Sequence, residues 1–262
     1  MRPPRLDEMN SSLRLRLLTR ADLPFADSVR ALAGWNQTPD DWQRFLATEP
    51  DGCFLAEWNG APAGTATTTV YGPDLAWIGM MLVHPEYRRR GIGRALLQRC
   101  IEHLRWRGVR CIKLDATPLG KKVYDELGFK DEWTLTRWEC ARCHPRPTTF
   151  DSRIRIWRDS DARSIEPLDS EAFGVTRNKI LRALAHQSRC ALVLESQPGS
   201  FAGYGFIRPG SQALYLGPLV AGSADAGVLL VEALIAQSAG QMIFWDIPDQ
   251  NAVAVKCAKE HG

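Results

Sequence analysis

Apolar and polar residues recur along the first 140 residues in patterns that predict one mixed sheet with helices packed on it. Residues 13–17 alternate as Leu-Arg-Leu-Arg-Leu, which is typical of a half-buried strand. Residues 95–104 repeat apolar positions at helical spacing, which indicates one buried helix face. The other elements expected here are helices at 19–33, 39–46 and 117–128 and strands at 53–58, 63–70, 76–83, 111–115 and 134–140. This order is of the α+β class.

The same order of elements starts again near residue 153. Strands are expected at 153–157, 190–195, 201–208, 214–220 and 242–246, and helices at 159–173, 176–184, 228–235 and 251–260. The chain therefore looks like a tandem repeat of one fold. We expect an N-terminal domain at 1–141, a linker at 142–151 and a second, divergent domain at 152–262.

The second domain has no strand after its last helix, whereas the first domain continues beyond Gly128 and Phe129 into the strand at 134–140. The sequence therefore predicts either an open sheet edge or a chain truncated at Gly262. A partner chain could cover that edge, and a homodimer is left open. The strand at 134–140 of the first domain could also cover it.

Composition excludes several classes of protein. With 45% hydrophobic and 24% charged residues, the 262-residue chain has the make-up of a soluble globular protein. A net charge of +3 gives no case for a nucleic-acid partner, and no apolar stretch is long enough to span a membrane. The seven cysteines come without a secretory signal, which favours reduced thiols and a cytoplasmic location.

The stretch 83–96 joins a buried strand to a helix through a basic, glycine-rich turn. Backbone N–H groups at a helix N-terminus attract anions, and Gly91 and Gly93 have no Cβ to keep a phosphate away. The stretch does not match the loop of nucleotide-hydrolysing enzymes or the dinucleotide-binding fingerprint. An ordinary solvated helix start with surface arginines is the alternative.

The pattern Arg88-x-x-Gly91-x-Gly93, after a Val-x-Pro corner, resembles the acyl-CoA pyrophosphate loop of the GCN5-related N-acetyltransferases. The resemblance implies that the backbone from Arg88 to Arg94 holds the pyrophosphate of acetyl-CoA and that the preceding strand end pairs with the pantetheine amides. The residues it assigns to acetyl-CoA are Met81, Leu82, Val83, Arg88, Arg89, Arg90, Gly91, Ile92, Gly93, Arg94 and Thr117. Thr117 stands where many relatives have an asparagine.

A second motif, Val-Tyr-Asp-Glu-Leu-Gly-Phe at 123–129, resembles the Leu-Tyr-x-x-x-Gly-Phe segment of the same family. Together the two motifs imply transfer of an acetyl group from acetyl-CoA to a primary amine by direct attack. Tyr124 is then the candidate general acid, because a phenol near the sulfur can protonate the leaving CoA thiolate. The alternative is that Tyr124 only packs a helix against the sheet.

No general base is assigned. Trp77 occupies the position where many relatives have a glutamate, and an indole cannot take a proton. Glu57, Asp74 and Glu86 lie near in sequence, but each is better explained as a solvated turn or strand-edge residue. His84 is better explained as a surface histidine.

The segment Cys140-x-x-Cys143-His144 matches the attachment motif of c-type haem, and it could supply part of a zinc site. No export signal accompanies it, and no second ligand pair lies at suitable spacing. A strand end that runs into a proline-rich linker is favoured, so no metal is predicted.

The second domain departs from the phosphate-binding pattern. Residues 221–226 contain no arginine, and Asp225 adds negative charge, although Asn251 precedes the last helix. We expect weak or no CoA binding there. The chain is thus interpreted as an N-acetyltransferase active in its N-terminal domain, with a small-molecule or peptide amine as acceptor. A catalytically silent acyl-CoA sensor or scaffold is the alternative.

Overall fold

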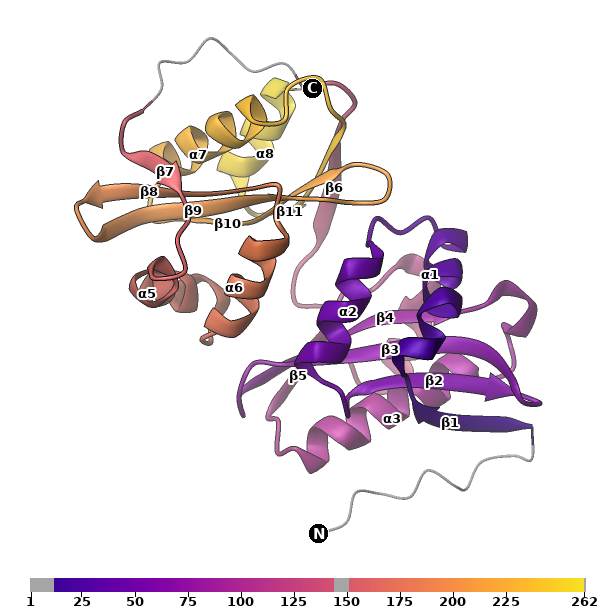
Figure 1. Ribbon diagram of the computed structural model, residues 1–262. Coiled ribbons are helices and arrows are strands. Elements are labelled where there is room, and N and C mark those ends of the chain that lie inside the picture. Colours follow the sequence, from indigo (N-terminus) through magenta and orange to yellow (C-terminus); the bar gives the residue numbers. More distant parts are fainter. Residues whose placement is uncertain (1–11, 144–150, 262) are drawn as a thin grey trace. The chain divides into compact units, whose positions relative to one another are not determined.

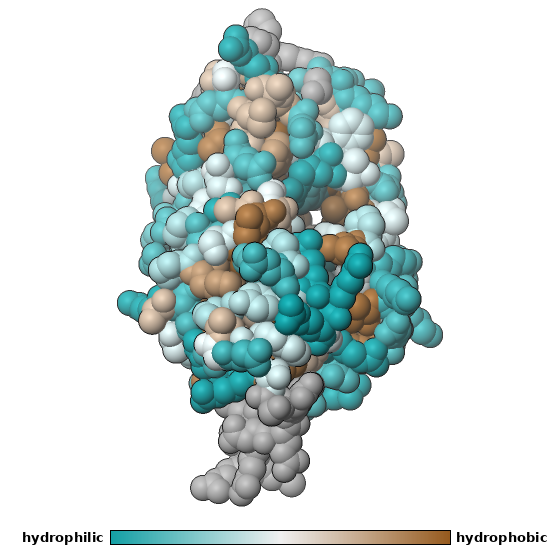
Figure 2. All heavy atoms as spheres, turned by 90° about the vertical axis from the view of Figure 1, so that its right-hand side faces the viewer, coloured by the Kyte–Doolittle hydropathy of each residue, from teal (hydrophilic) through white to brown (hydrophobic). Residues whose placement is uncertain are grey.

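The computed structural model describes residues 12–143 and 151–261, and the chain divides into two compact units, Met1–Lys130 and Asp131–Gly262. Both units combine one mixed sheet with helices, so the predicted α+β class is confirmed (Figure 1). Within the described residues, no helix has both the length and the apolar character that crossing a membrane requires. On the face drawn in Figure 2, hydrophilic residues predominate and apolar residues form small scattered groups.

The first unit is built on a five-stranded sheet in the order β1-β2-β3-β4-β5, antiparallel except for the parallel pair β4 and β5. Its strands are β1 (Leu13–Leu17), β2 (Cys53–Trp58), β3 (Ala61–Val70), β4 (Leu75–Val83) and β5 (Cys111–Leu114). Its helices are α1 (Leu23–Leu32), α2 (Pro39–Thr48), α3 (Ile92–Trp106) and α4 (Pro118–Glu126), with short 3-10 turns η1 (Arg20–Asp22) and η2 (Pro85–Tyr87).

Helices cover both faces of this sheet. The face that carries Ala76 and Ile78 packs on the apolar side of α3, and Tyr124 of α4 belongs to the same cluster. The other face carries Leu55, Met80 and Leu82 and packs under α1 and α2, with Trp42 fully buried. The two apolar clusters explain why β2 and β3, in the middle of the sheet, are buried along most of their length.

Strand β4 changes its partners along its length. Its pairing with β5 ends at Ile78 and Leu114, whereas its pairing with β3 continues to Val83. A register irregularity separates the pair of Thr65 with Leu82 from that of Thr67 with Gly79, and Met80 has a positive φ of 48°. The second half of β4 therefore keeps a neighbour on one side only.

The second unit has a six-stranded sheet in the order β6-β11-β10-β9-β8-β7, in which only β10 and β11 are parallel. Its strands are β6 (Leu135–Cys140), β7 (Ile154–Ile156), β8 (Cys190–Gln197), β9 (Ser200–Arg208), β10 (Leu214–Ala221) and β11 (Ile243–Pro248). Its helices are α5 (Asp161–Phe173), α6 (Asn178–Gln187), α7 (Ala224–Ala236) and α8 (Ala252–His261). The order of elements from β7 to α8 repeats that from β1 to α4.

Strand β6 follows the last helix of the first unit in sequence but lies in the sheet of the second. It pairs antiparallel with β11 from Leu135 opposite Pro248 to Cys140 opposite Ile243. Arg137 adds a two-pronged ion pair to Asp246, at 2.7 Å for each hydrogen bond. The expectation that residues 134–140 could cover the open edge of the second sheet is therefore confirmed. The units divide at Lys130, eleven residues before the boundary expected at 141.

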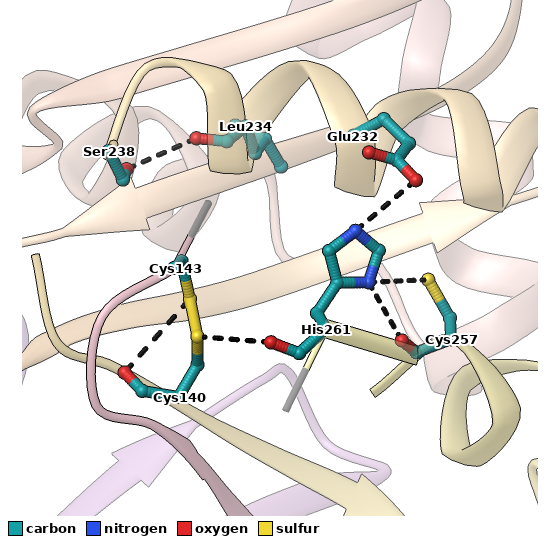
Figure 3. Close-up of a disulfide and its surroundings, with 7 residues drawn as sticks. All are labelled: Cys140, Cys143, Glu232, Leu234, Ser238, Cys257 and His261. Atoms are coloured by element: carbon teal, nitrogen blue, oxygen red, sulfur yellow. Dashed lines mark hydrogen bonds and ion pairs between the residues drawn. A yellow bond between two sulfur atoms is a disulfide. The ribbon is translucent and has the colours of Figure 1, made fainter. Parts of the chain in front are cut away.

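The expectation of reduced thiols is wrong for one pair of cysteines, because Cys140 and Cys143 form a disulfide at the end of β6 (Figure 3). The five other cysteines, all within the described residues, form no disulfide. Beside the disulfide, the buried side chain of His261 has its ring between Glu232, at 3.2 Å, and Cys257, at 4.0 Å. No cluster of His, Cys, Asp and Glu within residues 12–143 and 151–261 is arranged to hold a metal ion. His144 of the sequence motif lies outside the described residues.

A buried histidine on α3 links the stability of the first unit to pH. His103 is only 4% exposed and packs edge-on against Phe54, with ring centroids 5.7 Å apart. Burial, followed by repulsion from Arg107 and Arg99, lowers the pKa of His103 from 6.5 to about 4. The folded unit therefore holds this ring in its neutral form at pH values where the unfolded chain protonates it.

We expect the free energy of unfolding to fall as the pH is lowered from 6.5 to 4, by up to about 3 kcal/mol from His103 alone. Below 6.5 the unfolded chain binds a proton that the folded chain does not, so acid favours unfolding. Denaturant titrations at pH 7 and pH 5 measure the difference. His103→Phe should reduce it, and an equal loss in wild type and variant would contradict this role for His103.

Candidate functional site

The turn between β4 and α3 is shaped by two residues in the left-handed region. Arg89 has φ 62° and Gly91 has φ 79°, and Gly91 is the N-cap residue of α3. The Arg88 Nε donates a 3.2 Å hydrogen bond to the carbonyl oxygen of Val83, which ties the start of the turn to the end of β4. The chain thereby passes from strand to helix in a few residues.

The N-terminus of α3 presents backbone donors. The N–H of Ala95 bonds to the carbonyl oxygen of Gly91 at 3.0 Å. This is the first hydrogen bond of the helix. The N–H groups of Ile92, Gly93 and Arg94 lie before it in the sequence, so no carbonyl oxygen of the helix can accept from them. Such groups, together with the helix dipole, favour a bound anion. A methyl group added at Gly93 would lie 3.7 Å from Val83 Cγ2, so packing alone does not demand glycine there.

Two arginines of the loop are held by neighbouring side chains. The Arg90 guanidinium lies over the rings of Trp58, at 5.2 Å, and Tyr87, at 5.7 Å. Arg94 forms a 2.7 Å ion pair with Glu126, the last residue of α4. The loop is thus connected to the helix that carries Tyr124, and the two sequence motifs belong to one region of the first unit.

Tyr124 is a buried member of the core cluster under α3, with an exposed fraction of 9%. Its ring meets Phe129 edge-on, at a centroid distance of 6.3 Å. A Cβ added at Gly120 would lie 2.8 Å from the Tyr124 hydroxyl oxygen, so glycine at 120 leaves room for the phenol. Burial raises the pKa of Tyr124, which keeps the phenol protonated at neutral pH. The residue therefore both packs the core and keeps a proton to donate.

The remaining residues assigned from the sequence lie at the ends of neighbouring elements. Met81, Leu82 and Val83 form the end of β4 beyond its last pair with β5. A Cβ added at Gly64 of β3 would lie 2.7 Å from the Leu82 carbonyl oxygen, so the two strands approach closely there. Thr117 is the N-cap residue of α4, and its carbonyl oxygen accepts from the N–H groups of Gly120 and Lys121.

The structure adds one carboxylate that the sequence did not single out. Asp115 follows β5 directly, and its Oδ2 accepts a 3.0 Å hydrogen bond from the Trp77 indole. Trp77 and Asp115 are 38 residues apart, and only the pairing of β4 with β5 brings them together. The available sequence signal was a carboxylate at the last position of the strand predicted at 111–115.

The corresponding region of the second unit lacks these groups. The turn from β10 to α7 contains no arginine, and the Ser223 hydroxyl already accepts from the N–H of Ala226 at 3.2 Å. Tyr124 stands seven residues after Thr117, and the residue seven after Asn251 is Ala258, which has no phenol. A cavity of about 490 Å³ lies beside β10 and β11 and is lined in part by Arg177, Arg208 and Ser223.

Comparisons with known proteins match both halves of the chain. A model described as the acetyltransferase (GNAT) family matches residues 20–129, and one described as an acetyltransferase (GNAT) domain matches residues 165–262. An uncharacterized N-acetyltransferase of Bacillus subtilis is 29% identical over 177 residues, which are 68% of this chain and 62% of that protein. A holothin acyltransferase of Pseudoalteromonas is 24% identical over 233 residues, 87% of this chain and 76% of that protein.

Solved structures are similar over nearly the whole length. A crystal structure of a putative acetyltransferase from Pyrococcus horikoshii has a TM-score of 0.82 and 26% identity, covering 98% of this chain and 86% of that one. A tandem GNAT protein from the clavulanic acid biosynthesis pathway has a TM-score of 0.67 and 18% identity, covering 94% of each chain. The similarity to the tandem GNAT protein, at 18% identity, concerns the fold alone.

Gly91 and Gly93 should respond oppositely to replacement by alanine. Gly91→Ala places a side chain at φ 79°, which should lower the free energy of unfolding by about 1–2 kcal/mol. Gly93 lies within the helix, so Gly93→Ala should raise the free energy of unfolding by up to about 1 kcal/mol. Denaturant titration of both variants measures the two signs. A loss of the same size in both would contradict the left-handed role assigned to Gly91.

Proposed function

Because this chain belongs to the acetyltransferase (GNAT) family, we propose that its first unit transfers an acetyl group from acetyl-CoA to a primary amine. The observation that carries the proposal is the turn at 88–94, where the first turn of α3 has N–H groups without helical acceptors and two residues adopt the left-handed conformation. Its link to α4 through Arg94 and Glu126 adds the buried phenol of Tyr124 to the same region.

In this proposal the diphosphate of acetyl-CoA binds to the backbone between Arg88 and Arg94. Gly91 and Gly93 let the anion approach the main chain, and the arginines contribute positive charge. The pantetheine arm lies along Met81, Leu82 and Val83, where β4 has lost its pairing with β5 and keeps backbone groups available on that side. Thr117, at the start of α4, is a further contact of the cosubstrate.

The transfer proceeds by direct attack. The amine nitrogen forms a bond to the thioester carbon, and the carbon–sulfur bond breaks. Tyr124 gives its hydroxyl proton to the leaving sulfur, and the phenolate then recovers a proton from the nitrogen of the new amide. The raised pKa of Tyr124 suits this role, because the phenol is fully protonated when the sulfur leaves. The second unit has Ala258 in the corresponding place, so we assign the reaction to the first unit.

The acceptor is best sought among primary amines of two sizes. Relatives of this chain include enzymes named for acetylation of an alanine of ribosomal protein bS18, in Escherichia coli, and of mycothiol, in Thermobispora bispora. A panel should therefore contain peptides with a free N-terminus and small amines. Release of free CoA from acetyl-CoA, measured with a thiol reagent, tests the proposal. Tight acetyl-CoA binding without CoA release would favour a catalytically silent acyl-CoA sensor instead.

Gly93→Asp should weaken acetyl-CoA binding at least tenfold, because a carboxylate in the turn repels the diphosphate. The change should not harm the fold, since an acidic residue in the first turn of a helix is favourable. Gly93→Ala is the matched control and should bind acetyl-CoA more tightly than Gly93→Asp. Isothermal titration calorimetry measures the affinity of both variants for acetyl-CoA. Equal affinities would contradict the proposal that the diphosphate binds at this turn.

Tyr124→Phe should lower kcat by about 10²–10³-fold, the usual worth of a general acid, while the KM for acetyl-CoA changes less than about twofold. Phenylalanine fills nearly the same buried volume, so the core should remain intact. Steady-state kinetics at several acetyl-CoA concentrations separate the two constants. An unchanged kcat would mean that Tyr124 only packs the core.

A further inference from the structure

Asp115 lies at the point where the two parallel strands of the first unit part. Strands β4 and β5 pair from Leu75 with Cys111 to Ile78 with Leu114, and Asp115 is the next residue. Beyond this point β4 continues without β5 toward Met81 and Val83. Because the strands are parallel, both of their carboxyl ends point toward the region in which the thioester is proposed to lie.

The alternation of side chains determines the face on which this carboxylate lies. Ile112 and Leu114 pack on the cluster under α3, as do Ala76 and Ile78 of the neighbouring strand. Trp77 and Asp115 therefore point to the opposite face of the sheet, the one that α1 and α2 cover. The 3.0 Å hydrogen bond from the indole to Asp115 Oδ2 joins the two side chains across the strands.

The reaction requires a proton acceptor that Tyr124 does not provide. A primary amine is protonated at neutral pH and must lose a proton before its nitrogen can attack. The phenol of Tyr124 already carries its proton, because burial raises its pKa.

We propose that Asp115 takes the proton from the acceptor ammonium and that Trp77 positions its carboxylate, an inference that rests on the acetyl transfer proposed above. One ammonium proton passes to Asp115 and then to solvent, which leaves the neutral amine to attack. The proton on the leaving sulfur comes from Tyr124, so one proton is released for each amide formed. The indole only donates, so it orients the carboxylate without competing for the proton.

The test compares Asp115→Asn with a matched control that also lies next to these two strands. Asp74→Asn removes a carboxylate at their opposite end, where Asp74 pairs with Arg110. Asp115→Asn should lower kcat/KM for the amine by about 10²-fold or more, with acetyl-CoA affinity by calorimetry unchanged. Asp74→Asn should stay within about twofold of wild type, as expected for a surface ion pair.

Two further variants separate a proton acceptor from a merely structural residue. Asp115→Ala should regain activity when formate is added, because a small carboxylate can take the vacated place, whereas Asp115→Asn should not respond. Trp77→Phe should lower kcat by roughly tenfold at most, the worth of one hydrogen bond, and should leave acetyl-CoA affinity intact.

The outcomes distinguish this inference from the proposed function. If wild type releases CoA with an amine and Asp115→Asn stays within threefold of it, the role of Asp115 is refuted and the transfer stands. The same holds if the loss in Asp115→Ala does not respond to formate. If wild type releases no CoA with any amine of the panel, the transfer itself fails and the role of Asp115 falls with it.

Discussion

The parting of β4 from β5 is the constraint on which the first unit depends. A strand that keeps both neighbours has every backbone group bonded within the sheet and nothing left to offer a substrate. Here the pairing with β5 stops at Ile78, a register irregularity against β3 follows, and Met80 takes a positive φ. The second half of β4 is thereby supported on one side by β3 while its other side stays available. The left-handed Gly91 then turns the chain directly into α3.

The second unit repeats this scaffold with different residues at the corresponding positions. Its strands β10 and β11 are also parallel and also diverge after a short paired stretch. Ser223 caps the helix that follows, the turn before that helix contains no arginine, and Ala258 stands where the first unit has its phenol. The same fold can thus carry different residues at the turn before its central helix.

Periodicity and local motifs predicted the helices and strands and the glycine-rich turn between β4 and α3, because these depend on residues that are close in sequence. Trp77 was correctly seen to be unable to act as a base, but its hydrogen bond to Asp115 depends on two strands meeting side by side. The sequence likewise left open which sheet β6 joins, since the residue pattern of a strand does not determine the strand with which it pairs. The disulfide was missed because the state of the thiols was inferred from the lack of a signal segment. Cys140 and Cys143 are only three residues apart and lie close together at the end of β6.

The placement of β6 bears on how the chain can be divided for separate expression. A cut in the proline-containing segment after Cys143 looks natural by composition, yet it would leave β6 attached to the wrong half. The C-terminal fragment would then expose the whole hydrogen-bonding edge of β11, and such an edge favours strand pairing between molecules and precipitation. A cut between Lys130 and Asp131 keeps each sheet with all the strands that it uses. The point at which the chain is divided should therefore be chosen from the strand pairing in each sheet and not from the composition of the connecting segments.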